Sequence, residues 1–161
     1  MIKTGGNFDR EDKHIFFNAS NIDRQQFGAL KHGYVLVAVN ELTPETLNIV
    51  KEWTKKGCKV FIDSGIFNLA MEHVRKTGCT HNEALSLAPD KIIGFQELWD
   101  KYLYIMKELS EYSWGYIELD QGGQENKIKT RAKLEALGLR PIPVYHPFTD
   151  GWDYFDYLAE N

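Results

Sequence analysis

Residues 59–65 read Lys-Val-Phe-Ile-Asp-Ser-Gly, an apolar run that ends in two polar residues and a glycine. Its apolar residues do not alternate with polar ones, which indicates a strand buried on both faces, as in parallel sheets. Residues 34–39, Tyr-Val-Leu-Val-Ala-Val, form an earlier run of the same kind. Two such strands with a helical segment between them predict an α/β fold with a parallel sheet.

The remaining segments predict how often this unit of strand and helix recurs. Further strands are expected at 114–120 and 141–145, and helices at 43–57, 68–76, 80–87, 95–112, 124–137 and 152–159. A (β/α)8 barrel needs about 250 residues. Residues 34–161 therefore predict a partial TIM-barrel-like structure, about half of a barrel, with an open doubly wound sheet as the alternative. Residues 1–33 are expected to form an irregular N-terminal part of the same single domain, with a short strand at 14–18.

Composition excludes several classes of protein. The 161 residues are 43 % hydrophobic and carry a net charge of −4, which argues against disorder and against a broad affinity for nucleic acid. No apolar run approaches the ~18–20 residues that span a bilayer. The N-terminus has no apolar signal region, and two cysteines form no disulfide framework. We therefore expect a cytoplasmic protein with free thiols and no membrane contact.

Polar residues follow the predicted strands directly, at the edge where parallel α/β folds carry their functional side chains. These strand-end residues are Asn40, Glu41, Asp63, Ser64, Gly65, Asp120, Gln121 and His146. Two carboxylates in one pocket are able to divide roles, one as hydrogen-bond acceptor and one as acid or base. The alternative for each residue is an ordinary turn or helix cap. No spacing is typical of a zinc site, so we expect no metal and no cofactor.

A local basic segment stands out in this acidic chain. Residues 127–140 contain five basic residues and one acid. The pattern predicts either a contact with a nucleic-acid backbone through Lys127, Lys129, Arg131 and Lys133, or a solvated outer helix. The glycine-rich residues 120–124 before it predict either a helix-start turn or a phosphate-binding loop.

Three segments together resemble the tRNA-guanine transglycosylases and their phage and bacterial DNA-modifying relatives. These segments are VFIDSGIF at 60–67, YIELD at 116–120 and GLRPIPVYH at 138–146. The resemblance covers residues 34–161 and implies a (β/α)8 barrel that exchanges guanine for a 7-deazaguanine base, such as queuine, in tRNA or DNA. It implies that Asp63 is the catalytic acid or base. It also implies a base-binding set of Ser64, Gly65, Asp120, Gln121 and His146.

The sequence departs from the family in its catalytic parts. The attacking aspartate and the Cys3His zinc site of the family have no counterpart in residues 1–161, and Ile66 replaces the second glycine of the family's DSGGF motif. We therefore expect a transglycosylase-like protein that is incomplete by itself. Its barrel would be completed by a partner chain or a second copy, because half a barrel leaves sheet edges open.

The alternative is an inactive half-barrel that serves as a protein- or nucleotide-binding module. The C-terminal aromatic residues Trp152, Tyr154, Phe155 and Tyr157 would then form either the partner contact or a core-facing helix side. A flavodoxin-like phosphate-binding sheet is disfavoured, because residues 40–42 read Asn-Glu-Leu where a glycine-rich loop is needed.

Overall fold

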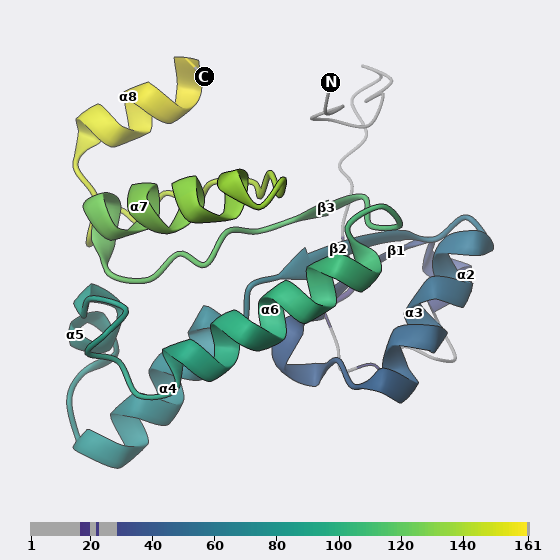
Figure 1. Ribbon diagram of the computed structural model, residues 1–161, viewed down its shortest axis with the longest axis horizontal. Coiled ribbons are helices and arrows are strands. Elements are labelled where there is room, and N and C mark those ends of the chain that lie inside the picture. Colours follow the sequence, from purple (N-terminus) through teal and green to yellow (C-terminus); the bar gives the residue numbers. More distant parts are fainter. Residues whose placement is uncertain (1–16, 20–21, 23–28, 161) are drawn as a thin grey trace. The chain divides into compact units, whose positions relative to one another are not determined.

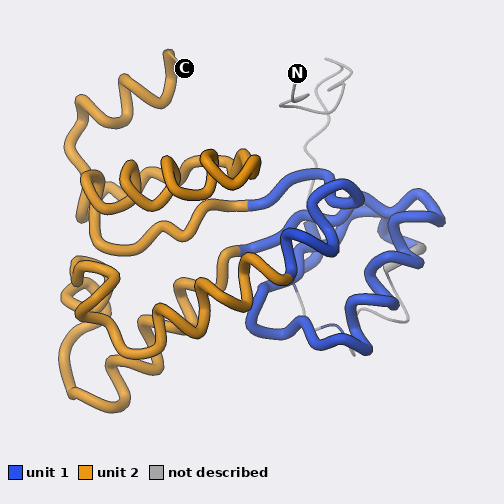
Figure 2. The backbone as a smooth tube through the Cα atoms, viewed as in Figure 1, with its two compact units in different colours: residues 1–63, 105–116 blue, residues 64–104, 117–161 orange. Residues whose placement is uncertain are grey.

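The computed structural model describes residues 17–19, 22 and 29–160 (Figure 1). Their contacts divide the chain into two compact units, shown in Figure 2. Unit 1 comprises Met1–Asp63 and Ile105–Tyr116, and unit 2 comprises Ser64–Tyr104 and Ile117–Asn161. The helix α6 (Phe95–Leu109) contributes residues to both units.

Unit 1 contains a parallel three-stranded sheet in the order β1-β2-β3. Strand β1 (Tyr34–Ala38) pairs with β2 (Lys59–Asp63) along its whole length, and β2 pairs with β3 (Gly115–Tyr116). Val35 and Val37 in β1 lie beside Val60 and Ile62 in β2, and all four are at most 1 % exposed. The predictions of an α/β class, a parallel sheet and strands near 34–39 and 59–63 are confirmed. Burial on both faces is not, because buried residues alternate with partly exposed ones in β1 and β2.

The helices of unit 1 flank these strands. They are α2 (Ala29–His32), the short 3-10 helix η1 (Val39–Glu41) and α3 (Pro44–Lys55). Helix α3 begins where predicted, because Thr43 and Thr46 exchange capping hydrogen bonds and Pro44 occupies the first turn. Helix α2 falls in the segment expected to be irregular. Of the strand expected at 14–18, residues 14–16 lie outside the described residues, and Asn18 forms an isolated bridge to Val35.

Unit 2 contains α4 (Ile66–Thr77), α5 (His81–Ser86), α7 (Gly123–Ala136), α8 (Trp152–Glu160) and the first part of α6. The predicted capping box of Thr80 and Glu83 starts α5. Gly78 ends α4 with φ 78°, a left-handed conformation that glycine adopts without strain. Local sequence signals therefore fix most helix boundaries.

Two predicted strands differ from the structure. The strand expected at 114–120 is regular only at Gly115–Tyr116. The strand expected at 141–145 is wrong, because its only pairing with the described residues is one bridge from Ile142 to Ile117. Pro141 and Pro143 explain the second difference, since proline has no N–H group to donate to a ladder. The helix expected at 95–112 ends earlier, at Leu109.

Within the described residues, no helix combines the length and the apolar character needed to cross a bilayer.

Candidate functional site

Three of the predicted site residues meet in unit 2 in one hydrogen-bonded cluster. The Ser64 hydroxyl donates to Oδ1 of Asp120 at 2.9 Å, and Oδ2 of Asp120 lies 2.6 Å from Nε2 of His146. Ser64 and Asp120 are 2 % and 8 % exposed, while the His146 side chain keeps 29 % of its surface in solvent. The cluster is therefore a buried carboxylate that two neighbours orient, with the imidazole at its solvent side.

Ser64 is held by the turn that starts α4. Its hydroxyl oxygen accepts the N–H of Ile66 at 3.3 Å, so that it donates and accepts at once. Gly65 follows with φ 83° and is buried. A side chain at this left-handed position would be strained. The DSG sequence thus supplies the turn that directs Ser64 toward Asp120.

The residues after Asp120 form a docked turn. The side-chain Nε2 of Gln121 donates to the carbonyls of Ala84 and Leu87 at 2.8 and 2.7 Å. The backbone N–H of Gly122 donates to the carbonyl of Leu85. A Cβ atom on Gly122 would lie 2.8 Å from the Leu87 carbonyl oxygen. Of the two interpretations of residues 120–124, the helix-start turn is the one observed. Gln121 is fully buried, and its Oε1 accepts no hydrogen bond from the described residues.

His146 is placed by a buried ion pair that the sequence analysis missed. Lys127 on α7 pairs with Asp150, and both side chains have no solvent exposure. Lys127 also donates to the carbonyl of Val144 at 2.7 Å, while Asp150 accepts the backbone N–H of His146 at 2.7 Å. The ion pair therefore holds the main chain on both sides of Tyr145, from which the His146 side chain extends to Asp120.

Glu118 also bonds to the main chain of the segment that precedes His146. Its Oε1 accepts the N–H of Val144 at 2.8 Å, and its Oε2 lies 3.7 Å from Nη1 of Arg131 with no hydrogen-bond partner among the described residues. Burial raises the pKa of Glu118 to about 7, although Arg131 and Lys127 oppose that shift. Arg131 in turn donates to the hydroxyl of buried Tyr154 at 3.1 Å.

The expected nucleic-acid contact through four basic residues is wrong for two of them. Lys127 and Arg131 are 0 % and 9 % exposed and pair with buried carboxyl groups. Lys129 and Lys133 are exposed. The helical spacing of the sequence indicates which basic residues are buried. Intervals of four and three residues place Lys127, Arg131 and Leu134 on one face of α7.

Asp63 does not belong to unit 2. It is the last residue of β2 in unit 1 and is half-buried. Asn40 and Glu41 lie in η1, also in unit 1. The catalytic role of Asp63 thus stays a prediction.

The C-terminal aromatic residues split between the two interpretations given above. Tyr154 is fully buried, whereas Trp152 is 73 % exposed and Phe155 is 44 % exposed. Tyr145 contacts both exposed rings, with centroids 6.1 and 5.3 Å away. Core packing of α8 therefore uses Tyr154 and leaves an aromatic cluster at the surface.

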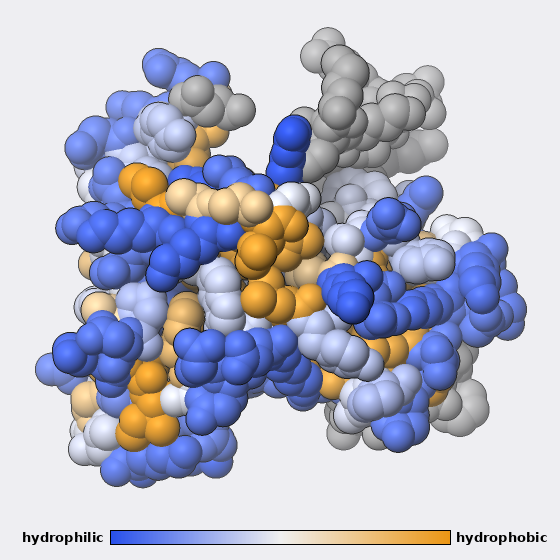
Figure 3. Space-filling view, viewed as in Figure 1, coloured by the Kyte–Doolittle hydropathy of each residue, from blue (hydrophilic) through white to orange (hydrophobic). Residues whose placement is uncertain are grey.

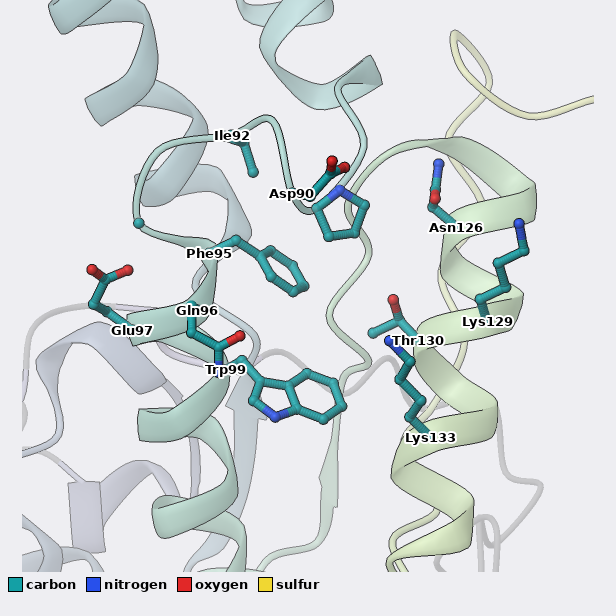
Figure 4. A pocket seen from close by; sticks show the side chains of 12 residues that line it. Asp90, Ile92, Phe95, Gln96, Glu97, Trp99, Asn126, Lys129, Thr130 and Lys133 are labelled. Atoms are coloured by element: carbon teal, nitrogen blue, oxygen red, sulfur yellow. The ribbon is translucent and has the colours of Figure 1, made fainter.

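Unit 2 also contains a cavity of about 650 Å³, which Figure 4 shows from close by. Its walls come from residues between 89 and 99, a segment that ends in the second turn of α6, and from α7. Ser64, Asp120 and His146 do not line this cavity. It is therefore a second feature of unit 2, separate from the hydrogen-bonded cluster.

The cluster combines a carboxylate, a hydroxyl and an imidazole, which are all hydrogen-bonding groups. Among the described residues, no group of three histidine, cysteine or acidic side chains is arranged to hold a metal ion. Comparison of the chain with protein families, curated proteins and solved structures gives no match.

Proposed function

We propose that Asp120 in unit 2 binds a guanine-type base, as the recognition part of a guanine transglycosylase that inserts a 7-deazaguanine into tRNA or DNA. The observation that carries this proposal is the hydrogen-bonded cluster of Ser64, Asp120 and His146. Three segments that are distant in the sequence bring these groups together, and each belongs to a motif that resembles the family.

The Asp120 carboxylate suits the edge of guanine. A carboxylate offers about four lone-pair positions on two oxygens. Ser64 and His146 each occupy one oxygen, so that each oxygen retains capacity for another donor. Guanine presents a ring N–H and an amino group side by side, and a carboxylate accepts such a pair in bidentate fashion. The two protein neighbours orient the carboxylate before the base arrives.

The remaining parts of the proposal come from the resemblance. Asp63 would act as acid or base on the exchanged base, and the βα units would form part of a TIM-barrel-like structure. In the family, a carboxylate attacks the ribose carbon and displaces the base. Because that carboxylate has no counterpart in residues 1–161, we assign base recognition to this chain and its completion to another segment or a partner chain.

The test is calorimetric titration of the full chain with 7-deazaguanine. We expect binding by the unmodified protein and at least tenfold weaker binding by Asp120→Asn, because an amide offers one acceptor and one donor where the base needs two acceptors. A tenfold loss corresponds to about 1.4 kcal/mol. Hypoxanthine lacks the amino group and should bind more weakly than 7-deazaguanine.

The matched control is Asp156→Asn, which removes the same charge from an exposed position on α8. It should leave the affinity unchanged. The absence of binding at millimolar 7-deazaguanine, or equal affinity of Asp120→Asn and the unmodified protein, would reject the proposal.

A further inference from the structure

We propose that the cavity between α6 and α7 binds a nucleotide of a single-stranded nucleic acid, with its base against the aromatic side chains of α6 and its phosphate at Lys133. This inference deepens the proposed function, which supplies the reason for a nucleic-acid substrate. The binding itself does not require the Asp120 cluster, because the Asp120 cluster does not line the cavity.

One wall of the cavity is aromatic. Phe95 and Trp99 lie four residues apart in the first turns of α6 and therefore on one helix face. Both are half-buried, and Figure 4 shows their rings pointing toward α7. Aromatic rings with one open face are the usual platforms for unpaired bases, since every base has a π face to stack. This wall therefore suits any of the nucleic-acid bases.

The opposite wall is polar. Asn126, Thr130 and Lys133 line it from one face of α7, and Figure 4 shows the Lys133 side chain pointing toward α6. Within the described residues, Lys133 forms no ion pair. Lys129 also lines the cavity, but it pairs with Glu125 at 2.6 Å. Lys133 is therefore the cation available to a phosphate group.

The acidic residues at the rim do not oppose an anion strongly. Asp90 pairs with Lys91 at 3.0 Å, and Glu97, which also lines the cavity, is exposed, so that water screens its charge. On the face drawn in Figure 3, hydrophilic side chains lie along α7 beside apolar ones. A volume of about 650 Å³ also lies within the range of small-ligand sites, which is roughly 300–1,000 Å³. The size of the cavity, its aromatic wall and Lys133, which has no ion pair among the described residues, together match one nucleotide.

The experiment measures binding of a fluorescein-labelled dT12 strand to the full chain by fluorescence anisotropy. An oligothymidine contains no guanine, so that its binding does not depend on base recognition at Asp120. We expect Trp99→Leu to weaken binding at least tenfold and Trp99→Phe to stay within threefold of the unmodified protein. We expect Lys133→Gln to weaken binding and to reduce the salt slope by about 0.7, the contribution of one phosphate contact on a single strand.

Matched controls separate the cavity from general surface effects. Trp152→Leu removes an exposed tryptophan from α8, and Lys76→Gln removes an exposed lysine from α4. Both should bind dT12 as the unmodified protein does. Unchanged 7-deazaguanine binding by Trp99→Leu would show that unit 2 is intact, and Asp120→Asn should retain dT12 binding.

Three results would overturn the inference. The first is no dT12 binding at the highest protein concentration tested, and the second is equal binding by the Trp99→Leu and unmodified proteins. The third is a Lys133→Gln protein with the affinity and the salt slope of the unmodified protein, which would show that no phosphate group lies at Lys133. Failure of the base-recognition proposal would appear differently, as a loss of 7-deazaguanine binding with dT12 binding unchanged.

Discussion

Units 1 and 2 hold neighbouring parallel segments together by different means. In unit 1, β1 and β2 pair in register over five residues, and their buried side chains are aliphatic. In unit 2, the segments at Ile117 and Ile142 share a single bridge. Side chains hold the rest of the second segment: Glu118, Lys127 and Asp150 bond to the main chain of Val144 and His146.

The difference follows from the cost of unpaired backbone groups. A buried N–H or C=O group without a partner is expensive, so each must be satisfied by some means. Where the prolines of residues 141–143 prevent a ladder, charged side chains supply the missing partners. Unit 1 should therefore be sensitive to side-chain volume and insensitive to pH, whereas unit 2 should be sensitive to charge.

The largest expected effect comes from Asp150→Asn. This change leaves Lys127 buried with no opposite charge to pair with, and such a broken pair typically costs about 3–5 kcal/mol. It also weakens the acceptor for the His146 N–H. We expect a lower urea midpoint in chemical unfolding and weaker 7-deazaguanine binding.

The control for this prediction is Glu125→Gln, which breaks the exposed ion pair with Lys129 on the same helix. Exposed pairs contribute about 0–1 kcal/mol, so that the midpoint should hardly move. The double change Lys127→Met with Asp150→Leu should recover part of the loss, because it leaves no buried charge. Equal midpoints for Asp150→Asn and Glu125→Gln would contradict the role given to the ion pair.

The second effect is a pH dependence that Glu118 imposes on unit 2. Its pKa is raised by burial from 4.5 to about 7 in the folded protein. Between these two pH values the folded chain keeps a proton that the unfolded chain releases, and stability therefore falls as pH rises through this window. A shift of this size corresponds to roughly 3 kcal/mol, lost between about pH 4.5 and pH 7.

Glu118→Gln isolates this contribution, because the amide oxygen still accepts the Val144 N–H and does not titrate. The difference in unfolding free energy between variant and unmodified protein should grow from pH 5 to pH 8, with the variant the more stable at pH 8. Histidine titrations are common to both proteins and cancel in the difference. A difference that stays constant across this range would show that Glu118 does not titrate there.

Local patterns predicted most of the fold. The strands β1 and β2 and the starts of α3 and α5 depend on signals within a few residues, such as the capping pairs at Thr43 and Thr80. The prediction of a strand at 141–145 was wrong. The apolar residues of this segment favour a strand, but Pro141 and Pro143 have no N–H group for pairing. Pairing depends on available N–H donors as well as on hydrophobicity.

The site was predictable where it depends on local sequence patterns. The predicted strand ends pointed to Ser64, Asp120 and His146, which do meet, although no regular strand directly precedes Asp120 or His146. The buried partnership of Lys127 with Asp150 was missed, because lysine and aspartate are ordinarily exposed and these two are 23 residues apart. Only tertiary contact reveals such a pair, although the helical spacing of Lys127 and Leu134 pointed to a shared face.

The smallest expected effect is that of Ile62→Val in β2, which tests unit 1. Ile62 is fully buried, and removing one methylene from such a position costs about 0.5–1.5 kcal/mol. The ladder hydrogen bonds are main-chain bonds and remain intact. We expect the same loss in urea unfolding at pH 5 and pH 8, with 7-deazaguanine binding unchanged. A loss that varies with pH, as expected for Glu118, would show that the two units do not differ in the way proposed.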